Sequence, residues 1–238
     1  MVRLFWMTTA FAVLAAFAVP VTAQDKKEAN TPADGSGKAK LTAEAEAVQK
    51  LSLASGLIHL GRKQKMPEAL IVAARILADV STVELKDKPT HETDPKADKS
   101  KEKAKAKPDV DNSPKALLEE AKAMSGNNEA IVKLANAVEI KRGAAGGPRR
   151  TTEVVEGYGT DVYRIKFRGD EVAKVLISGD GDTRLDLYIY DADGDLVTSQ
   201  VGPGDDALAT WVPRRAGVYT IKVVNRGRAQ NKYVLVTN

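Results

Sequence analysis

The chain of 238 residues contains no cysteine and only two histidines, and aromatic residues make up 5% of it. Without cysteine there is no disulfide, no thiolate zinc site, no iron–sulfur cluster and no cysteine nucleophile. Two histidines leave little material for a metal centre built from several imidazoles. The sequence also lacks a Gly-x-Ser-x-Gly nucleophile elbow and a His-Glu-x-x-His zinc motif. We therefore expect a protein without enzymatic activity.

Neither histidine is an obvious general base. His59 follows Ile58 in a predicted helix, where a partly buried structural role is the more common one. His91 lies in a charged stretch with no predicted structure, so nothing in the sequence positions it. A hydrolase that uses carboxylates alone stays open as an alternative. Adjacent acids such as Glu119 and Glu120 argue against it, because neighbouring helix positions point apart.

The net charge of +4 does not indicate a nucleic-acid partner. The segments Glu84–Ser113 and Pro148–Asn238 each carry equal numbers of basic and acidic residues, so the excess lies in the rest of the chain. Nowhere do aromatic residues interleave with a run of basic ones, as they do in many nucleic-acid-binding surfaces.

The first 23 residues have the pattern of a secretory signal peptide. Arg3 precedes an apolar stretch, Pro20 follows it, and Val21 and Ala23 stand at positions −3 and −1 of a cut before Gln24. The alternative is an uncleaved membrane anchor, but the apolar run is short for spanning a bilayer. No later segment is apolar enough to cross a membrane. We expect an exported protein that is secreted or resides in the periplasm or cell envelope.

Composition divides the rest of the chain into patterned and unpatterned segments. Apolar residues at helical spacing predict two helical hairpins, at 41–84 and 114–142. Polar or glycine-rich composition predicts a disordered leader at 24–40, a disordered charged linker at 85–113 and a Gly-rich linker at 143–150. The linker at 85–113 contains three prolines and almost no apolar residues, so we do not expect it to bury enough surface to fold.

The C-terminal part, residues 151–238, has the alternation of β-strands. Short runs of period two are separated by turn signals such as Gly179-Asp-Gly-Asp and Asp191-Ala-Asp-Gly-Asp. Seven or eight such strands predict an antiparallel sandwich. The expected fold class is therefore α+β, with a small helical-hairpin unit followed by a jelly-roll-like β-sandwich.

Four stretches of this part resemble a known family. They are Asp161-Val-Tyr-Arg-Ile, the run from Gly179 to Val197, and Gly217-Val-Tyr-Thr-Ile-Lys-Val with the closing Asn231-Lys-Tyr-Val-Leu. In order and spacing, Gly157–Asn238 resembles the bacterial pre-peptidase C-terminal domain. The resemblance implies a β-sandwich appended to exported proteins, among them secreted proteases, in which some members bind calcium. The helical part, with Leu60-Gly-Arg-Lys and Ala73-Ala-Arg-Ile-Leu, is similar to uncharacterised exported bacterial proteins.

A dense acidic cluster in the sandwich segment is the candidate metal site. Calcium takes six to eight oxygen ligands from carboxylates and carbonyls on turns. The candidate ligands are Asp180, Asp182, Asp191, Asp193 and Asp195. The alternative is that these residues serve the turns themselves, because aspartate and glycine tolerate tight turns and the glutamate that would complete an EF-hand loop is absent. Asp186 is separate, because it lies inside a predicted strand on one face with Tyr188 and Tyr190.

Exposed aromatic side chains are the candidate ligand contacts, although most aromatic residues of a small sandwich belong to its core. The candidates are Tyr188, Tyr190 and Trp211. Together these patterns predict an exported, non-catalytic binding or interaction protein whose partner is an envelope or extracellular protein or a polysaccharide. A calcium-stabilised accessory domain of an extracellular protease or other hydrolase system stays open as an alternative.

Overall fold

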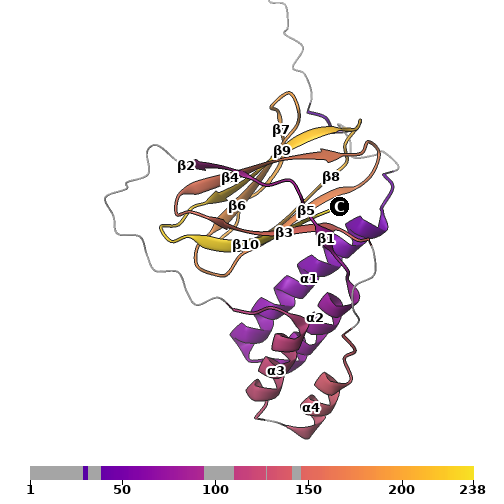
Figure 1. Cartoon of the computed structure of the whole chain (residues 1–238), viewed down its shortest axis with the longest axis vertical. Coiled ribbons are helices and arrows are strands. Elements are labelled where there is room, and N and C mark those ends of the chain that lie inside the picture. Colours follow the sequence, from indigo (N-terminus) through magenta and orange to yellow (C-terminus); the bar gives the residue numbers. More distant parts are fainter. Residues whose placement is uncertain (1–28, 32–38, 94–109, 127, 141–145) are drawn as a thin grey trace, which may run out of the picture.

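The computed structural model describes residues 29–31, 39–93, 110–126, 128–140 and 146–238. It consists of four helices in the N-terminal part and two five-stranded sheets that pack face to face, and eight of the ten strands follow the last helix (Figure 1). The expected α+β class, with helices followed by a β-sandwich, is confirmed. The predicted signal peptide at 1–23 lies outside the described residues.

The helices are α1 (Ala43–Gln64), α2 (Pro67–Asp79), α3 (Pro114–Met124) and α4 (Glu129–Asn136). Their first turns follow the sequence signals: Thr42, Ser113 and Asn128 cap α1, α3 and α4 with side-chain oxygens. α1 packs against α2, and α2 also packs against α3 and α4, so the two hairpins share one apolar core. Gly61 permits the close approach of α1 and α2, because a Cβ there would lie 2.9 Å from the side chain of Leu70.

One sheet has the strand order β1-β3-β10-β5-β8 and the other β2-β4-β9-β6-β7. All neighbouring strands are antiparallel except β1 and β3. Inward-facing residues from both sheets form the larger core, in which Tyr163, Tyr219 and Tyr233 are the largest fully buried side chains. The strands are β1 (Val83–Glu84), β2 (Thr90–Thr93), β3 (Arg149–Val155), β4 (Gly159–Phe167), β5 (Ala173–Ser178), β6 (Leu185–Tyr190), β7 (Leu196–Gln200), β8 (Asp206–Trp211), β9 (Gly217–Asn225) and β10 (Asn231–Thr237).

Residues 83–93, which we name the strap, contain two short strands. The disordered linker expected at 85–113 therefore does not begin at residue 85. β1 pairs with β3 of one sheet and β2 pairs with β4 of the other, so the strap connects the edges of both sheets. Leu85 is fully buried in the sandwich core, and its N–H donates to the carbonyl of Arg150. The physical reason is tertiary: the sandwich supplies the apolar contacts that the charged segment lacks. Residues 94–109 of the expected linker lie outside the described residues.

Two further boundaries differ from the expectation. In the predicted leader at 24–40, Asn30 bonds Asp191 and Arg215, and Lys40 forms a β-bridge with Glu171. The sandwich also starts earlier than residue 151, because β3 begins at Arg149. In both places, hydrogen bonds to strands or loops of the sandwich stabilise polar residues that have no apolar pattern of their own.

Candidate functional site

The outer faces of the two sheets are covered differently. α1 packs on β5 and β10, where Val48 and Leu51 meet Leu176 and Val236 in a small apolar cluster. The main sheet contacts of the described helices are therefore with the β1-β3-β10-β5-β8 sheet. We name the outer side of the other sheet, β2-β4-β9-β6-β7, the open face.

The strand register arranges the open face in rows. Val162, Lys222 and Tyr188 are direct neighbours across β4, β9 and β6, and Arg164, Thr220 and Tyr190 form the next row. Their strand neighbours Tyr163, Ile165, Ile189 and Ile221 point into the core, so the named rows point outward. Among the described residues on and beside these strands, five basic side chains face outward against two acidic ones, namely Arg164, Lys166, Arg184, Lys222 and Arg226 against Glu92 and Asp186.

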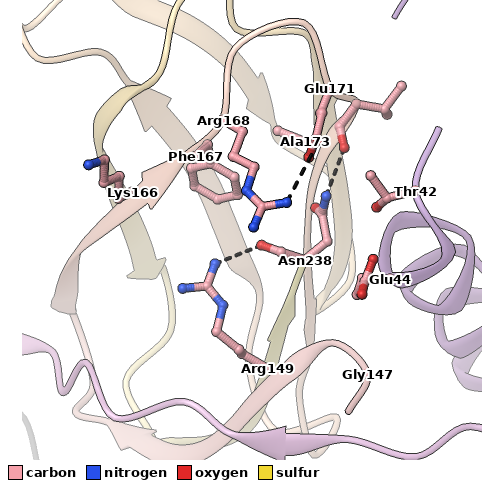
Figure 2. A pocket seen from close by; sticks show the side chains of 11 residues that line it. Thr42, Glu44, Gly147, Arg149, Lys166, Phe167, Arg168, Glu171, Ala173 and Asn238 are labelled. Atoms are coloured by element: carbon pink, nitrogen blue, oxygen red, sulfur yellow. Dashed lines mark hydrogen bonds and ion pairs between the residues drawn. The ribbon is translucent and has the colours of Figure 1, made fainter. Parts of the chain in front are cut away.

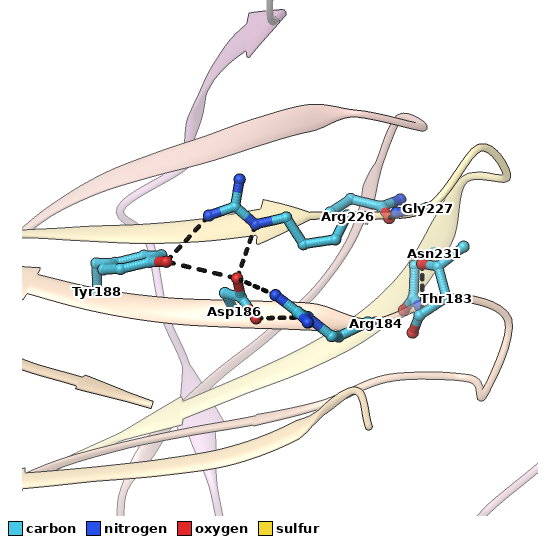
Figure 3. Close-up of polar contacts among 8 residues, drawn as sticks. Thr183, Arg184, Asp186, Tyr188, Arg226, Gly227 and Asn231 are labelled. Carbon is cyan, nitrogen blue, oxygen red and sulfur yellow. Dashed lines mark hydrogen bonds and ion pairs between the residues drawn. The ribbon is translucent and has the colours of Figure 1, made fainter. Parts of the chain in front are cut away.

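Asp186 accepts hydrogen bonds from two of the basic side chains of the open face, Arg184 and Arg226 (Figure 3). Arg184 donates to both of its carboxylate oxygens at 3.0 Å, and the Nε of Arg226 donates at 2.7 Å. Together with the surrounding chain, these contacts leave Asp186 with 0% exposure on a face that points to solvent. Burial raises the pKa of Asp186, but the two guanidinium groups outweigh burial and hold that pKa below its usual value. Asp186 is therefore a fixed anion that positions two cations.

Tyr188 belongs to the same arrangement. Arg226 donates to the Tyr188 hydroxyl at 3.0 Å, and its guanidinium carbon lies 5.9 Å from the centre of the Tyr188 ring. Each guanidinium has five N–H groups, so Arg184 and Arg226 keep donors for a ligand beyond those used here. Both arginine side chains are nearly half exposed.

The structure separates the three expected ligand contacts. Tyr188 and Tyr190 lie partly exposed on the open face. Trp211 lies instead in the core, 6% exposed, with its ring 4.8 Å from that of Phe167 and 5.4 Å from that of Tyr219. The expectation for Trp211 is corrected for that reason: its position on β8 is inward, and packing among aromatic rings leaves it almost no surface for a ligand.

Two of the five candidate calcium ligands, Asp180 and Asp191, use their carboxylates to accept backbone N–H groups of turns and strand ends. Asp191 accepts the backbone N–H groups of Asp193, Asp195 and Asn30 at 3.0, 3.0 and 2.8 Å. Burial raises the pKa of Asp191, but these N–H donors outweigh burial and hold it below its usual value. Asp180 accepts the N–H groups of Asp182 and Lys232. This geometry matches the turn-forming alternative.

Another group of potential metal ligands comes together at the junction of the two units. Within the described part of the chain, the one group of three histidine, aspartate or glutamate side chains whose ligand atoms converge is His59, Asp205 and Asp206. The sequence drew attention to His59 alone and not to the two aspartates. The available signal was weak: an Asp-Asp pair at a strand start, 146 and 147 residues from the histidine.

His91, whose position the sequence did not indicate, lies in β2 of the strap, where it pairs with Asp161 of β4. Its Nδ1 lies 2.6 Å from Asp161, whose other oxygen accepts from Tyr233 at 2.7 Å, and Tyr233 in turn lies 2.7 Å from the Tyr163 hydroxyl. Burial raises the pKa of Asp161, and it also raises the pKa values of both tyrosines. This network joins the two sheets through their core, so we assign it a structural role.

A pocket of about 330 Å³ lies where the N-terminus of α1 meets the end of the sandwich (Figure 2). Two of its basic groups have partners: Arg149 donates to the backbone oxygen of Asn238 at 2.7 Å, and Arg168 lies 3.8 Å from Glu171. The 11 lining residues include neither histidine nor serine. The pocket's one side-chain hydroxyl, that of Thr42, accepts the N–H of Ala45 at 3.1 Å and so caps α1.

Comparison with known proteins gives similarity of fold at low identity. The pre-peptidase C-terminal domain of a collagenase from Bacillus anthracis is 13% identical with a TM-score of 0.32, over 38% of this chain and 89% of that one. PirA is 19% identical with a TM-score of 0.30, over 42% and 100% of the two chains. A mitogen from Yersinia pseudotuberculosis is 12% identical with a TM-score of 0.30, over 39% and 85%.

No family model and no curated protein matches the chain. Among the residues that the structure describes, no helix has the length and apolar character needed to cross a bilayer. The sandwich is thus structurally similar, at low identity and low TM-score, to the pre-peptidase C-terminal domain of a collagenase and to other solved structures.

Proposed function

We propose that the chain is an exported, non-catalytic binding protein that uses the open face to hold an anionic polysaccharide of the cell envelope or exterior. The observation that carries the proposal is the contrast between the two outer faces. One is occupied by the chain's own helix α1, and the other presents two tyrosines and an excess of basic side chains. The signal-peptide pattern supports export.

The chemistry of the open face fits a polymer of acidic sugars. Guanidinium groups pair with carboxylates and sulfates through two parallel hydrogen bonds, and Asp186 already fixes Arg184 and Arg226 in position. The partly exposed rings of Tyr188 and Tyr190 offer apolar surface with a polar tip, which suits a sugar ring. Adjacent strands lie about 4.8 Å apart, so the rows provide repeated contacts for an extended chain.

Affinity gel electrophoresis and calorimetry with polygalacturonate and neutral dextran test this proposal. We expect the protein to bind polygalacturonate and to ignore dextran. The double variant Arg164→Ser/Lys222→Ser is expected to bind about tenfold more weakly, the equivalent of ~1.4 kcal/mol. Tyr190→Ala is expected to weaken binding without changing charge, which separates sugar stacking from simple ion exchange.

A matched control has the same net charge. Arg75 on α2 and Lys133 on α4 are exposed and lie away from the open face, so Arg75→Ser/Lys133→Ser is expected to bind like the wild type. Equal losses in both double variants, no binding of polygalacturonate, or equally tight binding of duplex DNA would each overturn the proposal.

A further inference from the structure

We propose that His59, Asp205 and Asp206 form a binding site for a divalent transition-metal ion of the zinc type at the junction between α1 and the sandwich. One histidine nitrogen and one oxygen from each carboxylate all lie within 4.8 Å of one another. Imidazole with carboxylates is a donor set that zinc, cobalt and nickel accept, whereas calcium takes oxygen ligands. The site is therefore chemically distinct from the acidic turns.

The three ligands come from two packed elements. His59 projects from α1, and Asp205 and Asp206 lie at the start of β8, which pairs with β5 beneath α1. The Nε2 of His59 lies 2.9 Å from the Oδ2 of Asp206. A metal ion would replace the proton that this contact now shares and would join the helical unit to the sandwich.

Neighbouring groups hold the two carboxylates in place. The N–H of Gly181 donates to the Oδ2 of buried Asp205 at 2.5 Å, and the side-chain amide of Asn231 donates to the same oxygen at 3.2 Å. The hydroxyl of Ser55 on α1 donates to the Oδ2 of Asp206 at 2.7 Å. Such outer partners orient ligands before the metal arrives, and their loss elsewhere costs about 10–100-fold in affinity.

The site is also accessible. The side chain of His59 is 47% exposed, and that of Asp206 is 30% exposed, which leaves room for entry of the ion and for water as a further ligand. The carboxylates of Asp205 and Asp206 place two negative charges near His59. Arg62 places one positive charge there, and its guanidinium is paired with Glu120. The balance around the site favours a cation.

The test is calorimetric titration of the purified protein, prepared without a polyhistidine tag, with Zn²⁺, together with Co²⁺ absorption spectra and thermal melts. We expect one Zn²⁺ per chain, cobalt d–d bands and a higher melting temperature with zinc. His59→Ala and Asp206→Asn are each expected to lower the affinity at least about tenfold. Because the metal competes with a proton for His59, binding is expected to weaken as the pH falls below neutrality.

The chain supplies its own control in His91, which also lies beside an aspartate but belongs to no group of three potential ligands among the residues that the structure describes. His91→Gln is expected to bind zinc within about twofold of the wild type. The proposal is overturned by the absence of 1:1 binding, by unchanged affinity in His59→Ala, or by an equal loss in His91→Gln. Far-UV circular dichroism checks that each variant is folded, and Asp206→Asn provides the second variant because it keeps the side-chain shape.

Discussion

The strap makes a quantitative prediction for Leu85→Ala. Leu85 is 0% exposed, and its side chain packs among residues from both sheets although it precedes the main sandwich segment by more than 60 residues. The substitution removes about three carbon groups, worth ~2.4 kcal/mol at about 0.8 kcal/mol per CH₂. The cavity left behind adds to this, so we expect the free energy of unfolding to fall by about 3 kcal/mol, within the range of ~2–5 kcal/mol for such changes.

Urea unfolding followed by tryptophan fluorescence measures this loss. Trp211 lies in the same core and reports directly on the sandwich, and the other tryptophan, Trp6, lies in the predicted signal peptide. Val83→Ala is the control, because Val83 is on the strap but 38% exposed, and we expect it to cost less than ~1 kcal/mol. If Leu85→Ala cost no more than Val83→Ala, the strap would not belong to the sandwich and the reasoning would be refuted.

Three other predictions follow from named contacts. Asp191→Ala removes the acceptor of three backbone N–H groups and should cost ~1–3 kcal/mol in urea melts, whereas Asp191→Asn, which keeps an acceptor, should cost less; equal losses would contradict this. Tyr233→Phe removes the hydroxyl that donates to the Oδ2 of buried Asp161, whose Oδ1 keeps His91, and should also cost ~1–3 kcal/mol, with unchanged stability as the contrary result. The carboxylate of Asp206 raises the pKa of His59 above its ordinary 6.5. The contribution of this ion pair to the free energy of unfolding should therefore be fully present below pH 6.5 and disappear as the pH rises through the folded-state pKa. Asp206→Asn should lower the pKa of His59 in an NMR titration, and an unchanged value would contradict the assignment.

The sequence predicted those parts of the fold whose signals are local. Alternation in Val162–Phe167 and Leu185–Tyr190 indicates strands because side chains on successive residues point to opposite faces. Thr42, Ser113 and Pro114 indicate helix starts because caps act within one turn. Such patterns depend on neighbours a few residues away and need no knowledge of the tertiary structure.

The strap was missed because its stabilising partners are distant. Leu85 stands alone among charged residues, and Pro89 argues against regular structure there. Only the fold supplies the edge of β3 for β1 and the edge of β4 for β2. The same holds for His91, whose partner Asp161 is 70 residues away. A composition-based prediction of disorder assumes that a segment must bury its own apolar surface, and this assumption fails where another part of the chain provides the core.

Both candidate sites depend on residues that the sequence separates. On the open face, Asp186 and Arg226 are 40 residues apart and meet because β6 and β9 are paired. At the junction, Ser55 and Asp206 are 151 residues apart and meet because α1 packs on the sheet that contains β8. Each aspartate is surrounded by donors before any ligand binds, and this pre-organisation lowers the cost of ordering side chains upon binding. The chain has no cysteine, so no disulfide links its helical unit to its sandwich. The strap and the contacts of α1 with the sheet make that connection instead. His59 lies at this junction, where a bound metal ion would strengthen it.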